Sequence, residues 1–219
     1  MENKIILIDK PAGISSFGVV AKVRAHLRDE FGHKVKIGHT GTLDPFATGL
    51  LILLSGKMTK KSNEFLKKDK TYEATLKLGY TSTTGDPEGD LKKINDIIPN
   101  LDQIQNTIKN FTGTVKQKVP AFSAVKINGQ RAYKLARAGK DFETPEREIT
   151  IYNIEILSYN YPELKIRCHV SSGTYIRTLA EDIGKALGTG AYLTALRRTE
   201  IDKYQVKDAK PLENFNSVI

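Results

Sequence analysis

The chain contains a single cysteine, Cys168, among 219 residues, so no internal disulfide can form and a reducing compartment fits. Long apolar runs are also missing. The strongest uninterrupted one, 50–54, is far shorter than the roughly 20 residues that a membrane-spanning helix needs. The first eight residues are too few and too soon charged to form a signal peptide. These absences predict a cytoplasmic protein with no membrane partner.

Signatures of nucleotide and metal sites are absent as well. The Gly-Lys pair at 56–57 invites comparison with a phosphate-binding loop, but Leu51 and Met58 stand where that pattern requires glycine and a hydroxyl residue. No dinucleotide fingerprint occurs. The histidines have no ligand spacing, and Cys168 and His169 point to opposite faces of a predicted strand. The sequence therefore predicts a protein without metal or cofactor.

Positive charge is what the chain has in excess, with 34 basic against 25 acidic residues and a net charge of +9. A solvated basic surface alone would produce this count, but an excess of this size in a small domain favours a polyanionic partner. Six lysines cluster within a short stretch: Lys57, Lys60, Lys61, Lys67, Lys68 and Lys70. We therefore expect a nucleic acid as the partner.

The apolar pattern predicts an α+β fold with a mixed, mostly antiparallel sheet, because strands and helices alternate without a regular βαβ rhythm. Strands are expected at 3–9, 50–54, 72–78, 164–170 and 147–157, the last with a bulge near 152–153. Helices are expected from a cap at Ser15 or Ser16 through Leu27, and at 59–67, 101–111, 131–138 and 176–187. Residues 81–90 should form a loop.

One carboxylate, Asp44, lies in a stretch of small and flexible residues, Gly38–Gly49, with the sequence GHTGTLDPFATG. An Asp-Pro turn is the plain interpretation of this pattern. However, Pro45 pushes Asp44 into an extended backbone, and a buried strand follows directly. A carboxylate displayed in this way can also act as a nucleophile at a sugar carbon.

Two residues far from Asp44 could complete such a site. Arg177 lies in the first turn of a predicted helix, where a cation opposes the helix dipole at a cost of about 0.3–1 kcal/mol. It is either an exposed surface residue or the partner that keeps a carboxylate ionised and aimed. Tyr72 begins an amphipathic strand after the lysine cluster. It is either a core residue or an aromatic platform that stacks on an unpaired base.

Six ordered blocks covering nearly the whole chain resemble the TruB family of tRNA pseudouridine synthases. The first two are Asp9–Gly13 with Ser15-Ser16, and the signature Gly38–Gly49. The third is Lys70-x-Tyr72 followed by Leu78-Gly79 and Thr84-x-Asp86-x-x-Gly89. The last three are Val119–Ala124 with Lys126, Gly129, Tyr133, Ala136-Arg137 and Gly139; Ser172–Arg177 with Leu179, Asp182 and Gly184; and Ala191–Leu193 with Leu196–Arg198.

The resemblance implies the pseudouridine synthase fold, in which a central sheet is flanked by helices and loops, and a role for each matching residue. Asp44 falls on the catalytic aspartate and Arg177 on the arginine that pairs with it. Tyr72 falls on the tyrosine that stacks on the flipped uracil and is a candidate for proton movement at its C5. His39 matches the histidine that fills the space left by the flipped base. Residues lining the uridine pocket are matched by Tyr175 and Leu196.

The resemblance also implies an isomerase that converts the T-loop uridine at position 55 of tRNA to pseudouridine, with no cofactor. We expect one catalytic domain over 1–219 without a C-terminal PUA domain, acting as a monomer on the T-arm stem-loop without a protein partner. Two alternatives stay open: a non-catalytic tRNA binder or folding helper, and the same chemistry on another RNA. Whether Asp44 attacks C1′ or first promotes a glycal-type elimination is also open.

Overall fold

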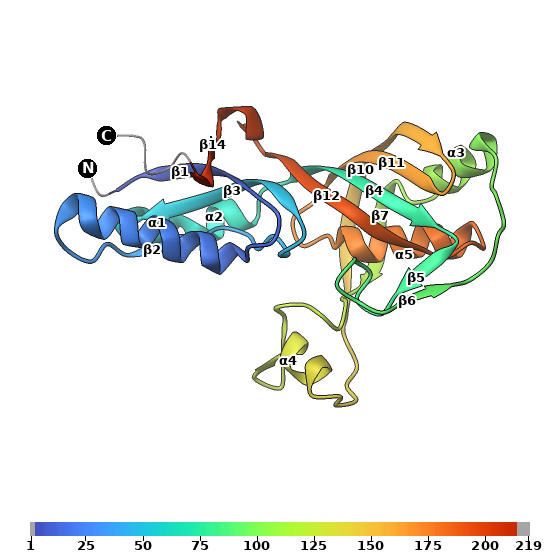
Figure 1. Cartoon of the computed structure of the whole chain (residues 1–219), viewed down its shortest axis with the longest axis horizontal. Helices are drawn as coiled ribbons and strands as arrows, with labels where there is room; N and C mark the ends of the chain where they lie inside the picture. Colours follow the sequence, from blue (N-terminus) through green and yellow to red (C-terminus); the bar gives the residue numbers. More distant parts are fainter. Residues whose placement is uncertain (1–2, 214–219) are drawn as a thin grey trace. The chain divides into compact units, whose positions relative to one another are not determined.

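The computed structural model describes residues 3–213, which form two compact units (Figure 1). The second unit is Ala74–Ala195, and the first consists of the described residues on either side of that range. The boundaries between the units fall inside strands β4 (Lys70–Leu78) and β12 (Ala191–Ile201). Each of these strands therefore contributes residues to both units.

The sheet of the first unit is built around β3 (Thr48–Ser55), the buried strand that the sequence predicts. It pairs antiparallel with β1 (Ile5–Lys10) and with β2 (Ile37–His39), and parallel with β12. Two short strands complete this sheet: β13 (Tyr204–Gln205) beside β12, and β14 (Lys210–Pro211) beside β1. The loop that carries Asp44 joins β2 to β3, so it starts and ends at neighbouring strands.

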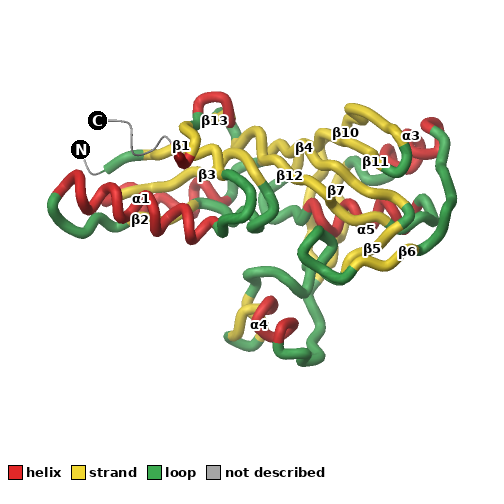
Figure 2. The backbone as a smooth tube through the Cα atoms, viewed as in Figure 1, coloured by secondary structure: helices red, strands yellow, loops and turns green. Residues whose placement is uncertain are grey.

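Helix α1 (Ser16–Phe31) lies along this sheet and contacts β2 (Figure 2). It begins where the Ser15 hydroxyl accepts the Gly18 N–H at 3.0 Å, and ends at Gly32, which adopts a left-handed conformation with φ 72°. Its buried face carries Val19, Val20, Val23 and Leu27. A 3-10 helix η1 (Gly56–Lys61) and helix α2 (Ser62–Leu66) follow β3, and a second short 3-10 helix, η2, covers Val206–Asp208.

The sheet of the second unit contains, in spatial order, β4, β11 (Glu163–Val170), β10 (Glu146–Asn160) and β7 (Gly113–Lys118). Strand β10 is antiparallel to both of its neighbours. Its pairing with β11 shifts register between Ile151 and Asn153, where the sequence predicts a bulge. Helices α3 (Leu101–Lys109) and α5 (Ile176–Ala186) contact each other, and they contact β10 and β7 respectively. This contact positions the start of α5, which carries Arg177.

Two small hairpins extend the second unit. One pairs β5 (Tyr80–Ser82) with β6 (Leu91–Lys93). The other pairs β8 (Lys126–Ile127) with β9 (Gln130–Arg131) and leads into helix α4 (Ala132–Arg137). The segment with α4 projects from the sheet of its unit (Figure 2).

The structure confirms the α+β class and the mixed, mostly antiparallel sheet, and it changes several boundaries. The helix predicted over 59–67 is a 3-10 helix followed by one turn and a half of α-helix. Residues 81–82, predicted as loop, belong to β5. Strands β7 and β12 have no counterpart in the prediction. In β12 the adjacent Arg197 and Arg198 interrupt any apolar alternation, although Arg198 is buried.

Candidate active site

Asp44 lies at the start of a tight turn in the loop between β2 and β3. The Ala47 N–H donates to the Asp44 carbonyl at 3.1 Å, which closes a turn around Pro45 and Phe46. The Asp-Pro turn expected from the sequence is therefore present. The Asp44 side chain is partly buried. A turn of this kind does not exclude a chemical role, because it fixes the main chain from which the carboxylate projects.

The residue before Asp44 is held by Ser16 in the first turn of α1. The Ser16 hydroxyl accepts the Leu43 N–H at 2.7 Å and donates to the Leu43 carbonyl at 2.9 Å. Ser16 is only 2% exposed, so these bonds are shielded from water. Both main-chain groups of Leu43 are thus satisfied by one side chain, which limits rotation of the backbone next to Asp44.

The residue after Asp44 is held by the turn that follows β1. The Pro45 carbonyl accepts the Gly13 N–H at 2.9 Å and the Lys10 ammonium at 3.1 Å. The same fully buried ammonium also donates to the carbonyls of Pro11 and Ile14, at 2.9 and 2.7 Å. The block 9–16 therefore holds the backbone on both sides of Asp44 by hydrogen bonds, a role that the sequence alone did not reveal.

Glycine is required where the loop returns to the sheet. Gly49 has φ 100°, and a Cβ added there would lie 2.3 Å from the carbonyl oxygen of Arg198. A side chain at this position would separate β3 from β12. The glycine at position 49 is thus explained by this close approach of two backbones.

His39 ends β2, five residues before Asp44, and is partly buried. The Gly41 N–H donates to its Nδ1 at 3.4 Å, so the ring proton belongs on Nε2. Burial, and secondarily the charge of Arg198, lower the pKa of His39 below its ordinary value. His39 is therefore a neutral imidazole at neutral pH. Tyr72 on β4 and Leu196 on β12 are both buried side chains of the first unit.

Arg177 belongs to the second unit and is buried, with 5% of its surface exposed. Its guanidinium donates to the carbonyls of Thr84 and Phe122 at 2.9 and 2.7 Å, and it forms an ion pair with Asp86 at 3.3 Å. The interpretation of Arg177 as an exposed surface residue is therefore wrong. These contacts hold the guanidinium in a fixed orientation.

Asp86 is a residue whose role the sequence analysis missed. It is 3% exposed and accepts the Thr84 hydroxyl at 2.5 Å and the Glu88 N–H at 3.0 Å, besides pairing with Arg177. Gly85 beside it has φ 73°, a left-handed conformation that favours glycine, and a Cβ there would lie 2.5 Å from Oε1 of Glu181. The block Thr84-x-Asp86-x-x-Gly89 contained this signal, but a carboxylate in a loop of turn formers carries no sequence mark of burial.

Tyr175 directly precedes α5, and its main chain is fixed by Gln117 on β7. The Tyr175 N–H donates to Oε1 of Gln117 at 2.8 Å, and Nε2 of Gln117 donates to the Tyr175 carbonyl at 3.0 Å. One buried amide thereby satisfies both main-chain groups of the residue before the helix. Gln117 was not predicted, since it lies in a strand that the sequence did not reveal.

The predicted site residues are divided between the units. Asp44, His39, Tyr72 and Leu196 belong to the first, whereas Arg177 and Tyr175 belong to the second. The pairing of Asp44 with Arg177 stays a prediction. Within residues 3–213 there is no group of His, Cys, Asp and Glu side chains that could hold a metal ion, and no helix long and apolar enough to cross a membrane.

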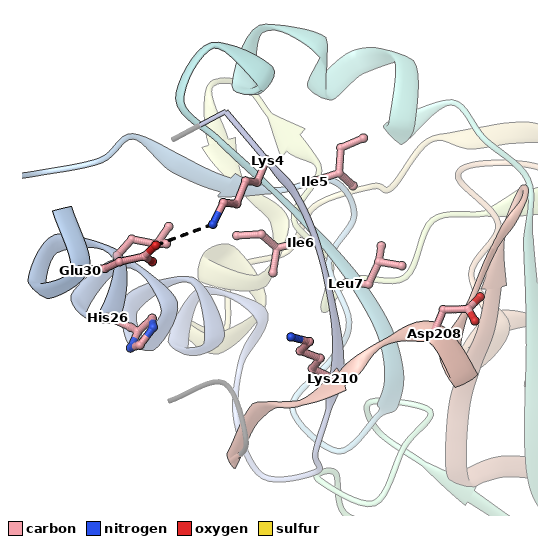
Figure 3. A pocket seen from close by; sticks show the side chains of 9 residues that line it. Lys4, Ile5, Ile6, Leu7, His26, Glu30, Asp208 and Lys210 are labelled. Carbon is pink, nitrogen blue, oxygen red and sulfur yellow. Dashed lines mark ion pairs between the residues drawn. The ribbon is translucent and has the colours of Figure 1, made fainter. Parts of the chain in front are cut away.

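A pocket in the first unit does not involve these residues. It lies against β1 and α1 and is lined by Ile6, His26 and the Lys4–Glu30 ion pair, with Lys210 of β14 at its side (Figure 3). None of the predicted site residues lines it. The candidate site is therefore defined by the Asp44 loop and not by this cavity.

Comparison with known protein families agrees with this fold and with the resemblance to the TruB family. The model for the TruB family pseudouridylate synthase N-terminal domain matches residues 28–176, more than half of the chain. The model for the tRNA pseudouridylate synthase B C-terminal domain matches residues 177–219. The fold and these family matches together define a pseudouridine synthase, an isomerase that modifies RNA. The chain belongs to the TruB family.

Curated relatives named tRNA pseudouridine synthase B match nearly the whole chain. The protein from Phocaeicola vulgatus is 43% identical over 98% of this chain and 92% of its own length, and that from Flavobacterium johnsoniae is 44% identical over 98% and 95%. The Aquifex aeolicus protein is 45% identical over 97% of this chain and 73% of its own length. These lengths show that the similarity extends through both units.

Two solved structures are similar in fold. One is a Cbf5-Nop10-Gar1 complex, with a TM-score of 0.74 and 30% identity over 96% of this chain. The other is an H/ACA RNP bound to a substrate RNA containing 2′-deoxyuridine, with a TM-score of 0.70 and 28% identity over 96%. This chain spans about half the length of each matched chain, 52% and 51% respectively.

Proposed function

We propose that this protein converts uridine to pseudouridine in tRNA, at position 55 of the T-loop, with Asp44 as the nucleophile. The observation that carries this proposal is that the residues on both sides of Asp44 are fixed by hydrogen bonds to their main-chain groups. The bonding residues are Ser16, Gly13 and Lys10. A carboxylate held in this way needs little reorganisation to meet a sugar carbon, which is how positioning lowers a reaction barrier. The names of the curated relatives support tRNA as the substrate.

The reaction detaches uracil from the ribose, turns it and joins C5 to C1′. The C5 proton is released as the new bond forms, and N1 gains a proton, so no oxidant, reductant or phosphate is consumed. Asp44 must be ionised to act on C1′ or to promote elimination toward a glycal. We assign Arg177 as its cationic partner, because the contacts of Arg177 with Thr84, Phe122 and Asp86 fix the direction of the guanidinium.

A uridine inside a folded loop must first leave its stack, at a cost of a few kcal/mol that protein contacts offset. We assign Tyr72 to stacking on the flipped uracil, and Tyr175 and Leu196 to the walls of its pocket. His39 occupies the space that the base leaves. The lowered pKa of His39 supports this assignment, because a neutral imidazole fits between bases without the cost of burying a charge.

RNA binding is supported by two basic segments. The first is the lysine cluster of residues 57–70 in the first unit. The second is the α4 segment, residues 119–140, which carries no acidic residue and five exposed cations: Lys126, Arg131, Lys134, Arg137 and Lys140. Because such side chains neutralise phosphates and release counterions, we propose that both segments contact the T-arm backbone. We place the activity in the cytoplasm, in line with the lone buried cysteine.

The test is tritium release from an unmodified T-arm stem-loop that carries C5-tritiated uridine, followed by mapping of the product. We expect release by the wild type and none by Asp44→Asn or Asp44→Ala, with RNA binding retained in both. Equal release by the Asp44 variants would refute the nucleophile assignment. Tight binding without release by the wild type would favour a tRNA binder or folding helper, and release from another uridine would favour another RNA target.

A further inference from the structure

Arg198 in the middle of β12 is a buried cation, with 1% of its surface exposed. Its guanidinium donates to three main-chain carbonyls: from Nε to Leu50 at 2.8 Å, and from the two terminal nitrogens to Gly41 at 3.1 Å and Thr42 at 3.5 Å. No carboxylate within residues 3–213 forms an ion pair with it. Its partners are backbone groups only.

These carbonyls lie on both sides of the catalytic candidate. Gly41 and Thr42 come just before the Asp44 turn, and Leu50 follows the turn on β3. One planar guanidinium thus joins the two ends of the loop with a fixed fork of donors, a geometry that a lysine ammonium lacks. The backbone of Arg198 also packs directly on Gly49, its partner in the parallel pairing of β12 with β3.

Stability alone is a poor explanation for this arrangement. A buried cation without a carboxylate partner is costly, and an apolar side chain of similar volume often stabilises a core better. A second cation, Lys70, lies beside it, 7% exposed and bonded to the carbonyls of Leu66 and Lys68. Burial, together with the charge of Arg198, lowers the pKa of Lys70 to about 8. Two adjacent buried cations add repulsion to the cost of burial.

We propose that Arg198 is a positioning residue for Asp44: its guanidinium holds the two ends of the Gly41–Leu50 segment together and thereby fixes the direction of the carboxylate. The proposal rests on the function proposed above. It assigns Arg198 no contact with RNA, because its side chain is buried and its donors face the protein backbone. Loss of the guanidinium should therefore slow the chemical step and leave RNA affinity unchanged.

The first experiment compares Arg198→Lys with the wild type in single-turnover tritium release, with enzyme in excess over the T-arm stem-loop. Arg197→Lys is the matched control, because Arg197 is the next residue on the same strand, is partly exposed and bonds to Asp9. A displacement of about 1 Å can cost a factor of about 100 in rate. We expect a loss of about 100-fold for Arg198→Lys, less than threefold for the control, and RNA dissociation constants within twofold for all three proteins.

Hydrogen exchange tests the positioning directly, without relying on activity. Amides of residues 41–47 should exchange faster in Arg198→Lys than in the wild type, while those of β1 and the centre of β3 keep their protection. Uniformly faster exchange would indicate general destabilisation and overturn the proposal. A single-turnover rate of Arg198→Lys within threefold of the wild type would also overturn the proposal. So would a loss of RNA affinity large enough to account for the lost activity.

A second variant covers the case in which Arg198→Lys fails to fold. Replacing Thr42 by its α-hydroxy analogue turns the Gly41 carbonyl into an ester carbonyl, a weaker acceptor for Arg198, and leaves every side chain in place. We expect a three- to tenfold slower single turnover with little change in thermal midpoint, and an unchanged rate would overturn the proposal. Wild-type protein without tritium release would refute the proposed function, whereas the exchange comparison would still test the role of Arg198 in the loop.

Discussion

Replacement of Asp86 by asparagine tests whether the buried ion pair between Asp86 and Arg177 stabilises the second unit. Asp86→Asn keeps the shape of the side chain and an oxygen for the Thr84 hydroxyl and the Glu88 N–H. It removes the charge opposite Arg177 and places an amide N–H where the guanidinium donates. The hydrogen bonds of Arg177 to the carbonyls of Thr84 and Phe122 remain, but its ion pair with residue 86 is lost.

The expected cost follows from the burial of both partners, whose side chains are at most 6% exposed. Removing one partner of a buried ion pair costs about 3–5 kcal/mol. Because Asp86→Asn keeps the other hydrogen bonds, we expect the lower end, about 3 kcal/mol. In a chain of this size each kcal/mol lowers the thermal midpoint by about 2–4 °C, which gives a fall of about 6–12 °C.

Urea and thermal unfolding provide the assay, with Asp90→Asn as the control. Asp90 lies in the same loop but is exposed, so its substitution should change the free energy of unfolding by no more than about 0.5 kcal/mol. Single-turnover tritium release by Asp86→Asn should also fall by about 100-fold, because Arg177 loses its anchor. If Asp86→Asn unfolds like Asp90→Asn, the ion pair does not stabilise the second unit and the reasoning is wrong.

Two further predictions concern pH and salt. Burial and the charge of Arg198 lower the folded-state pKa of His39 below 6.5. The unfolded chain therefore binds the proton more readily, and the free energy of unfolding should fall as the pH drops below 6.5. The urea midpoint should fall more steeply with decreasing pH for the wild type than for His39→Gln, and equal slopes would contradict the pKa shift. RNA affinity should decrease steeply with salt, by about 0.7–0.9 in the logarithmic slope per neutralised phosphate. This salt slope should become shallower when four lysines are changed to glutamine: Lys60, Lys61, Lys67 and Lys68. It should not change in the double control Lys92→Gln/Lys93→Gln. An unchanged slope in the fourfold variant would mean that the phosphate contacts lie elsewhere.

Local patterns were sufficient for the parts of the fold that depend on one segment at a time. Strict alternation identified β4 and β11, and the expected cap at Ser15 or Ser16 identified the start of α1, which the structure caps with Ser15. Strand β12 escaped prediction because its buried Arg198 is stabilised by carbonyls of another segment, which no local pattern records. Propensity and periodicity describe a residue in relation to its neighbours in sequence, whereas this arginine is buried by partners far along the chain.

The same distinction applies to the site. Asp44 was predicted because its glycines and proline are local signals, and two of these glycines, Gly41 and Gly49, have positive φ angles of 146° and 100°. Asp86 and Gln117 were missed, although each holds a predicted residue, Arg177 or Tyr175, in place. A carboxylate or amide that is satisfied by tertiary partners looks like any surface polar residue in sequence. Residues that support a site are therefore harder to predict than residues that perform its chemistry.

The bond between Arg198 and the Gly41 carbonyl joins positions 157 residues apart. Because this bond needs both segments, the Asp44 loop reaches its final geometry only after β12 has been added beside β3. During synthesis on the ribosome, a nascent chain that has exposed residues 1–100 already carries Asp44, His39 and Tyr72 but not the guanidinium that closes the loop. Under the proposed function, catalytic competence requires that translation has passed Arg198, and truncated chains that keep the signature block but end before β12 should be inert.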